Sequence, residues 1–259
     1  MSSGSPTKAS LRKRSTGKDK ATSESGVPLP VLSLDGSTPP PTSLRHHPTC
    51  NLCPLRTDAT LAPCVPTRHL GQPPSPTTDM ILVVGHRLGV RENQTGISFT
   101  GESGDLLTTG YLRDELNLES RAAIYLANVT RCFNPADTIP IGQYRTCFTN
   151  YMIPDVQYLT SLPARHRAIL CLGAVAARYF FELAGFPRLR LRDVLGFQAT
   201  PLPPWTLFVT YHPANLLVAP EYARITEVHL YLLDLFLHDR LPSRSQPTIV
   251  PPHNPWRFP

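Results

Sequence analysis

The spacing of the cysteines is typical of a metal site. A C-x2-C pair near the start is followed by a second pair with 14 residues between its members; the pairs are Cys50 with Cys53 and Cys132 with Cys147. Thiolates in such pairs ligate zinc or an iron–sulfur cluster, and the C-x2-C motif alone does not separate the two. A disulfide framework is the alternative, although nothing else in the chain is typical of a secreted protein. Cys64 is either another ligand or a loop thiol.

A glycine-rich segment runs from Gly85 to Gly101. Its glycines let the backbone turn sharply and approach a ligand closely. The segment lacks the G-x-x-x-x-G-K-[ST] and G-x-G-x-x-G patterns of phosphate-binding loops, which disfavours a nucleotide-hydrolysing enzyme. Phe99, within this segment, suits stacking on a planar base; the alternative is packing in the core.

Two further polar side chains lie at the ends of predicted strands. Asn128 carries an amide, which is both donor and acceptor and suits reading the edge of a pyrimidine. His212 begins the run His-Pro-Ala-Asn-Leu-Leu after the last strand, and the alternative for it is a purely structural role. Ligands of parallel sheets bind beyond the carboxyl ends of the strands, so these side chains are expected at one rim.

The elements that must position these residues alternate along the chain. Near-continuous apolar runs predict four strands buried on both faces, over residues 80–85, 122–129, 166–173 and 205–211. Stretches with helical length and spacing lie at 103–117, 142–161, 174–184 and 221–239. This alternation predicts an α/β fold with three α/β/α layers around a central four-stranded parallel sheet. Cys171, inside the third run, is expected to pack as a small hydrophobic side chain.

Composition separates this domain from two low-complexity ends. Of 29 prolines in 259 residues, 13 fall in residues 1–79 and six in 240–259. We expect a disordered basic tail over 1–45, a folded domain over 46–240 and a proline-rich tail over 241–259. The basic tail is either a phosphate-binding arm or a solubilising extension. Its lack of an apolar signal segment predicts an intracellular protein without a membrane association.

The order of these motifs resembles the iron–sulfur-containing branch of the uracil-DNA glycosylase superfamily, families 4 and 5. The resemblance covers residues 50 to 239. It rests on C-x2-C-P-L, then G-x3-G-x2-E-N-x-T-G-x-x-F-x-G-x-S-G-x-L-L, N-V-x-R-C, a further C, L-G-x-x-A and T-Y-H-P-A-x-L-L, at matching spacings.

The resemblance implies a role for each matching position. Four cysteines would hold a 4Fe-4S cluster that organises loops near DNA: Cys50, Cys53, Cys132 and Cys147. The base-binding set would be Gly85, Phe99, Gly101 and Asn128, with Phe99 stacking on the flipped base and Asn128 bonding its edge. His212 matches the catalytic histidine that faces the base. Leu216 and Leu217 match an apolar wedge inserted into the duplex, unless one of them packs inside.

One motif departs from the family pattern. Family 4 usually has G-E-x-P-G, whose glutamate helps to position water, where this chain has Gly-His-Arg-Leu-Gly at residues 85–89. Three interpretations remain: His86 acts as base or water positioner, since imidazole titrates near neutrality; Glu92 takes over; or the site is reshaped for another base. Family 5 also lacks this glutamate and remains active.

The sequence therefore predicts a DNA glycosylase that flips uracil or a modified pyrimidine out of DNA and hydrolyses its N-glycosidic bond, leaving an abasic site. The alternatives are excision of a bulky hypermodified phage pyrimidine in anti-phage defence, and a non-catalytic DNA-binding homologue. We expect a monomer, in bacterial or phage-host cytoplasm, whose partner is single- or double-stranded DNA.

Overall fold

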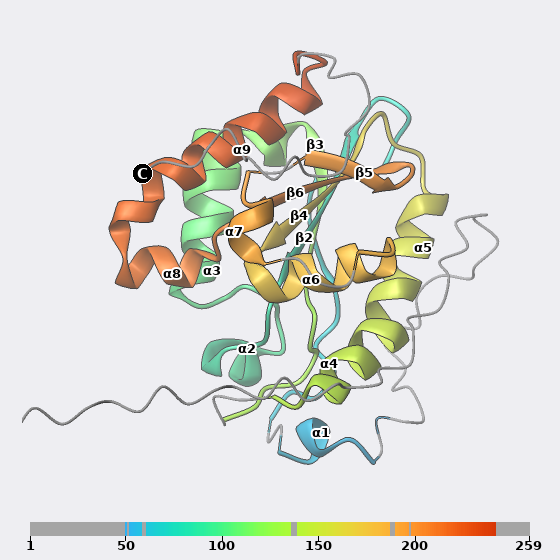
Figure 1. The fold of residues 1–259 in the computed structure, drawn as a ribbon, viewed down its shortest axis with the longest axis vertical. Helices are drawn as coiled ribbons and strands as arrows, with labels where there is room; N and C mark the ends of the chain where they lie inside the picture. The colour runs from blue at the N-terminus through green and yellow to red at the C-terminus, as the bar shows by residue number, and fades with distance from the viewer. Residues whose placement is uncertain are drawn as a thin grey trace, which may run out of the picture.

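A computed structural model describes residues 50, 52–58, 61–135, 139–186, 190–196 and 198–241. The basic tail expected over 1–45 lies outside these residues, as do residues 242–259 of the expected C-terminal tail. The described residues form one mixed sheet with helices around it (Figure 1). In this part of the chain, no helix is both long and apolar enough to cross a membrane.

The sheet has six strands in the order β1-β3-β2-β4-β6-β5. Their bounds are β1 Arg68–Gly71, β2 Asp79–Gly85, β3 Ala122–Asn128, β4 Arg167–Leu172, β5 Gln198–Leu202 and β6 Trp205–Thr210. The four predicted strands are the central β2, β3, β4 and β6, and they run parallel. β1 and β5 add one antiparallel strand at each edge.

The expected four-stranded parallel sheet is thus corrected to a six-stranded mixed one. Both missing strands are short edge strands without a continuous apolar run. β1 reads Arg-His-Leu-Gly with alternating exposure, and β5 contains Pro201, which cannot donate to a ladder. Apolar runs identify strands buried on both faces, so edge strands of this kind carry little of that signal.

Helices and helical turns connect the strands. Their bounds are α1 Pro54–Asp58, α2 Val90–Thr95, α3 Glu102–Asp105, η2 Leu106–Glu115, η3 Leu118–Ser120, α4 Ile141–Cys147, η4 Phe148–Met152, α5 Ile153–Ser161, α6 Ala174–Leu183, α7 Leu191–Val194, α8 Pro213–Val218, η5 Pro220–Tyr222 and α9 Ala223–Leu237. The four predicted helical stretches coincide with α3–η2, α4–η4–α5, α6 and η5–α9. The first two of these contain π-helical segments rather than continuous α-helix.

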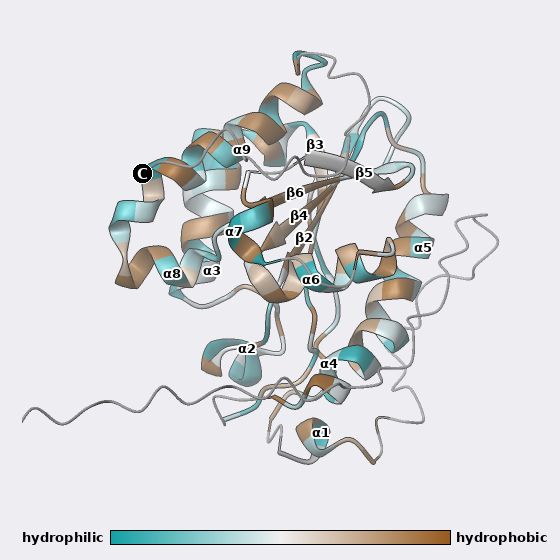
Figure 2. Cartoon of the chain, in the orientation of Figure 1, coloured by the Kyte–Doolittle hydropathy of each residue, from teal (hydrophilic) through white to brown (hydrophobic). Residues whose placement is uncertain are grey.

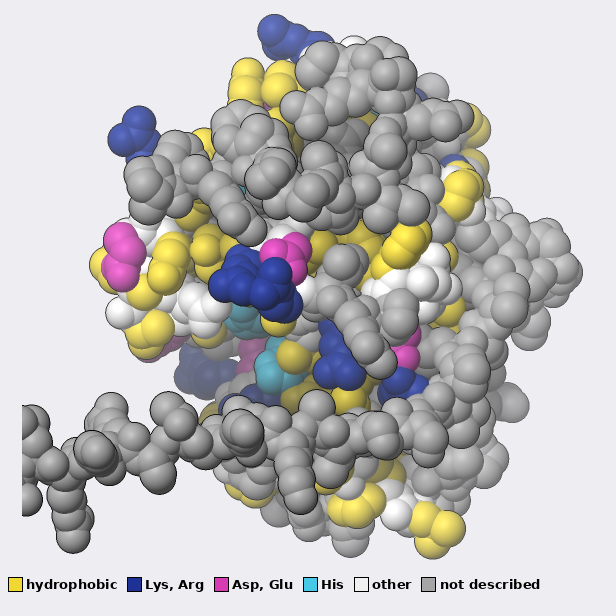
Figure 3. Space-filling model, viewed as in Figure 1, with side chains coloured by type: hydrophobic (Ala, Val, Ile, Leu, Met, Phe, Trp, Pro, Cys, Tyr) yellow, Lys and Arg dark blue, Asp and Glu magenta, His cyan; other side chains and the backbone are white. Residues whose placement is uncertain are grey.

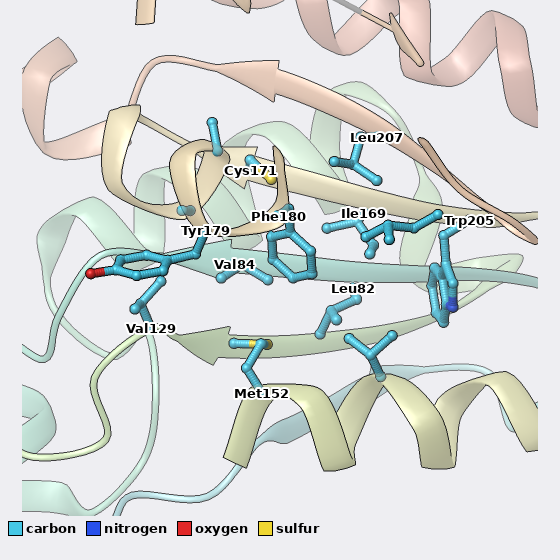
Figure 4. Close-up of a cluster of buried hydrophobic side chains, with 14 of the residues drawn as sticks. Leu82, Val84, Val129, Met152, Ile169, Cys171, Tyr179, Phe180, Trp205 and Leu207 are labelled. Carbon is cyan, nitrogen blue, oxygen red and sulfur yellow. The ribbon is translucent and has the colours of Figure 1, made fainter. Parts of the chain in front are cut away.

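Each face of the sheet is covered by its own apolar cluster. Leu82 and Val84 of β2 pack on one side with residues of α5 and α6, among them Phe180 (Figure 4). Ile81 and Val83, which alternate with them, pack on the other side with residues of η2 and α9. The central strands β2, β4 and β6 are accordingly drawn brown, as apolar segments, in Figure 2. This arrangement confirms the α/β class and its three layers.

The carboxyl ends of the parallel strands meet at one edge. Gly85 at the end of β2 is paired with Asn128 at the end of β3, and Leu172 of β4 is paired with Thr210 of β6. The helices α1, α2 and α4 lie beyond this end of the strands, toward the bottom of Figure 1. Sheet, glycine-rich segment and cysteine-bearing segments therefore converge on one edge.

A buried carboxylate anchors the opposite end of β2. Asp79, which is 2% exposed, accepts two hydrogen bonds from Arg165, at 2.9 and 2.7 Å, and lies 3.0 Å from His166 Nδ1. Arg121 lies 3.9 Å from the same carboxylate. These contacts join β2 to the segments that precede β3 and β4.

Substituting Asp79→Ala is expected to lower the free energy of unfolding by about 1.5–3 kcal/mol, because it removes the buried carboxylate that accepts charged hydrogen bonds from Arg165. Urea denaturation measures this difference. Asp114→Ala is the matched control, since Asp114 forms only a solvent-exposed pair with Arg113 and its loss should leave the unfolding midpoint unchanged. Equal effects of the two substitutions would contradict the anchoring role.

Candidate active site

Three predicted side chains surround one glycine at the carboxyl edge of the sheet. A Cβ built on Gly85 would collide with Asn128 Oδ1 and would lie 2.9 Å from Phe99 Cζ and 3.4 Å from His212 Nε2. Residues from four separate parts of the chain therefore converge on one point. Glycine is required here because any side chain would fill the space between them.

Asn128 projects its amide from a rigid position. It ends β3 in register with Gly85, and the N–H of Val129 donates to Gly85 O at 3.0 Å. The residue is 3% exposed, and its side-chain oxygen lies against the Gly85 position. Its donor and acceptor suit the edge of a pyrimidine.

Phe99 is held in an unusual backbone conformation. Its φ is +58°, in the left-handed region that non-glycine residues rarely adopt. Arg68 Nη1 donates to the carbonyls of Ser98 and Phe99 at 3.3 and 3.4 Å, and a Cβ on Gly104 would collide with the Phe99 backbone. The ring lines the Gly85 position and also joins the apolar cluster, as the core-packing interpretation expects. Stacking of this ring on a base stays a prediction.

The Glu92 carboxylate ties the glycine-rich segment together. Oε2 accepts the N–H of Gly89 at 2.9 Å, and Oε1 accepts the N–H groups of Thr100 and Gly101 at 2.9 and 3.0 Å. Gly101 thus contacts Glu92 rather than the atoms around Gly85. This geometry gives Glu92 a role in closing the loop that carries Phe99.

His212 presents a defined nitrogen to the same space. It caps α8, and its Nδ1 accepts the N–H of Ala214 at 3.2 Å. Burial, with a smaller contribution from His86, lowers the pKa of His212 to about 4, so the ring is neutral at physiological pH. Because Nδ1 is the acceptor, the single ring proton lies on Nε2. His212 therefore directs an uncharged N–H donor toward the Gly85 position.

His86 follows Gly85 directly and pairs with an aromatic residue that sequence analysis missed. Its Nε2 is hydrogen-bonded to the hydroxyl of Tyr144, and the two rings stack with centroids 5.3 Å apart. Burial, together with the neighbouring Arg87, lowers the pKa of His86 to about 4. The contact spans 58 positions of the chain, so no local pattern could have identified it.

Five cysteines lie near one another beyond this edge. Cys50, Cys64 and Cys132 share a buried apolar cluster, and the partly buried Cys53 packs against it. Cys147 is buried and interacts electrostatically with Cys50, Cys53 and Cys132. The Cys64 N–H donates to Cys132 Sγ at 3.2 Å, and the two sulfurs lie 4.0 Å apart. Tyr151 places its hydroxyl 3.0 Å from Cys50 Sγ and 3.5 Å from Cys64 Sγ. All six cysteines of the chain are described, and none forms a disulfide.

The chemistry of this cluster fits a sulfur-ligated metal group. Burial raises the pKa of the Cys147 thiol to about 12, and burial also raises that of Cys50. A bound cation would reverse this by stabilising the thiolates. In the described residues, no three His, Cys, Asp or Glu side chains converge as single-ion ligands would.

The two predicted wedge residues have different environments. Leu216 is 5% exposed and belongs to the cluster on one face of the sheet, whereas Leu217 is 50% exposed. Val218, which sequence analysis did not single out, is 83% exposed at the end of α8. The exposed apolar pair is therefore Leu217 with Val218.

Comparison with known proteins gives one family. The model of the "Uracil DNA glycosylase superfamily" matches residues 73–236. Three similar proteins are each described as a type-4 uracil-DNA glycosylase. The protein of Pyrobaculum aerophilum is 29% identical over 143 residues, covering 54% of this chain and 69% of the relative. That of Sulfurisphaera tokodaii is 29% identical over 154 residues, covering 57% and 65%. That of Thermotoga maritima is 27% identical over 140 residues, covering 53% and 66%. The matched segment thus spans about two thirds of each relative.

The adjacent leucines of α8 provide a matched pair of substitutions. Leu216→Ala is expected to lower the free energy of unfolding by about 2–4 kcal/mol, because it opens a cavity in the core. Leu217→Ala removes the same atoms from a half-exposed site and should change it by less than about 0.5 kcal/mol. Denaturant unfolding of both variants tests the assignment, which is wrong if Leu217→Ala is the more destabilising.

Proposed function

The chain belongs to the uracil DNA glycosylase superfamily, and on that basis we propose that it is a DNA glycosylase that excises uracil or a modified pyrimidine and leaves an abasic site. The observation that carries this proposal is the convergence of Asn128, Phe99 and His212 on Gly85. A flipped base needs a flat apolar surface, an edge-reading amide and a donor for its developing charge. Phe99 is proposed to supply the apolar surface, Asn128 the amide and His212 the donor.

The proposed reaction begins with extrusion of the base. Unstacking costs a few kcal/mol, which stacking on Phe99 and hydrogen bonds to Asn128 offset. Leu217 and Val218 are the apolar side chains proposed to fill the vacated stack, because they are exposed while Leu216 is not. On the face drawn in Figure 3, basic side chains lie beside the histidines, where they could contact DNA phosphates.

Bond cleavage then places negative charge on the departing pyrimidine and positive charge on the sugar. The neutral His212 Nε2–H is proposed to donate to the oxygen where the negative charge develops. A preorganised donor of this kind is worth about 3 kcal/mol in the transition state. Water completes the hydrolysis at the sugar. We propose that Glu92 shapes the pocket loop instead of activating this water, since both of its oxygens accept backbone hydrogen bonds.

The resident cofactor is proposed to be a 4Fe-4S cluster held by Cys50, Cys53, Cys132 and Cys147. When bound, the cluster would fix the segments that carry its ligands rather than take part in redox chemistry. Cys64 is proposed to support it from outside the ligand set, through its N–H bond to Cys132 Sγ.

We propose that the partner of this protein is DNA and that the protein acts in the cytoplasm of a bacterial or phage-host cell. The monomeric state and the identity of the excised base remain predictions.

Asn128→Ala and His212→Ala are each expected to lower the rate of base release on the order of 100-fold or more, because each removes a group that bonds the flipped base. Affinity for undamaged DNA should stay within about twofold, since phosphate contacts dominate it. Base release is measured by alkaline cleavage of single- and double-stranded oligonucleotides carrying uracil or modified pyrimidines.

Full activity of both variants would refute the assigned pocket. Binding without release from any substrate by the parent protein would favour a non-catalytic homologue.

Cys132→Ser is expected to remove the brown colour and near-blue absorbance of protein purified without oxygen, because a hydroxyl replaces a ligating thiolate. Cys64→Ser should keep the iron content of the parent, since it leaves the backbone N–H donor in place. Cys171→Ala is the control for a buried cysteine far from the cluster, in β4. Iron and zinc analysis of the four proteins decides the question. A colourless parent protein with one zinc would refute the iron–sulfur assignment.

A further inference from the structure

The His86–Tyr144 contact joins the pocket to the segment that bears a cysteine ligand. His86 follows the Gly85 position directly, and its carbonyl accepts the N–H of Thr130 at 3.3 Å. Tyr144 lies on α4, which ends at Cys147. The planes of the His86 and Tyr144 rings are inclined by only 24°, and Nε2 of His86 is hydrogen-bonded to the Tyr144 hydroxyl.

Further aromatic rings support Tyr144 from within the core. Its ring centroid lies 6.1 Å from that of Tyr179, which in turn stacks on Phe148 at 5.3 Å. Tyr179 and Phe148 are both buried. Tyr144 is thus held by a packed core, and it can hold His86 in turn.

The acidities of the two groups set the direction of the hydrogen bond. A phenol is a much stronger acid than a neutral imidazole N–H, and an unprotonated ring nitrogen is a better acceptor than a phenol oxygen. His86 is neutral, so it carries a single ring proton. Tyr144 therefore donates to Nε2, and the ring proton resides on Nδ1. Nδ1 makes no hydrogen bond to another described residue.

Building on the proposed glycosylase function, we propose that Tyr144 is a positioning residue that fixes His86 as a hydrogen-bond donor to an oxygen of the flipped nucleotide. In this arrangement His86 cannot act as a general base, because its only unprotonated nitrogen is occupied by Tyr144. The residue that stands in place of the family's glutamate would thus have a different chemical role. It would be a second uncharged donor near His212 Nε2.

The test is a double-mutant cycle in single-turnover base release from single-stranded uracil DNA, with holoprotein of matched iron content. Tyr144→Phe is expected to slow the bond-cleaving step about tenfold, the effect of one hydrogen bond, while DNA affinity stays within about twofold. His86→Ala should slow the step on the order of 100-fold. Adding Tyr144→Phe to His86→Ala should cause no further loss, because Tyr144 acts through His86. Tyr158→Phe, a tyrosine of α5, is the control for hydroxyl removal elsewhere.

Two results distinguish a donor from a base. His86→Gln retains a donor but cannot accept a proton from water, so it should recover most of the rate lost in His86→Ala. If it recovers none, or if Tyr144→Phe has its full effect in the His86→Ala background, the inference is overturned.

A readout independent of activity separates this inference from the proposed function. Long-range 1H–15N spectra of 15N-histidine protein, assigned with His86→Gln, should show the Nδ1–H tautomer in the parent and a mixture of tautomers in Tyr144→Phe. An Nε2–H tautomer in the parent would overturn the inference whether or not any base is released. Absence of base release with the Nδ1–H tautomer present would instead refute the glycosylase proposal alone.

Discussion

The parallel pairing of β2 with β3 is the constraint on which the site depends. It places Gly85 opposite Asn128, and the absence of a side chain at Gly85 leaves the space that Phe99 and His212 also border. A slip of one residue in this register would turn Asn128 to the other face of the sheet. The pairing is fixed by strands whose two faces are both buried, so the same apolar clusters that stabilise the fold also set the pocket geometry.

Specific partners hold the buried charged groups of the fold. Asp79 accepts hydrogen bonds from Arg165, Glu92 accepts them from backbone amides, and Arg131 donates to Asp155 at 2.5 Å. Arg131 Nε, by contrast, has no hydrogen-bond partner among the described residues. Burial also raises the pKa of the Cys147 thiol, a cost that a bound cation would offset.

The sequence predicted the central strands and the converging residues because both have strong signals. Strands that are buried on both faces appear in the sequence as apolar runs. The carboxyl ends of parallel strands lie at the same edge of the sheet, so the sequence alone predicted that Asn128 and His212 lie at that edge. The edge strands could not be predicted because β1 and β5 are short and partly polar. Leu216 and Leu217 are identical in type, and only their position on α8 decides which one is buried. Tyr144 was missed because a contact across 58 residues leaves no trace in a local pattern.

The resemblance puts a glutamate where this chain has His86, and that difference would change the electrostatics of the proposed reaction. A carboxylate beside the pocket would stabilise the positive sugar but repel the negative charge growing on the base. In the proposed reaction, two neutral histidines would donate hydrogen bonds to the leaving base without adding any net charge, and such interactions are strong where water is excluded. The sugar then needs negative charge from elsewhere. Glu92 is close enough to His212 to oppose the lowering of its pKa, so its field reaches the pocket. Glu92 would supply that charge from a fixed position, because its oxygens accept hydrogen bonds from backbone amides of the loop.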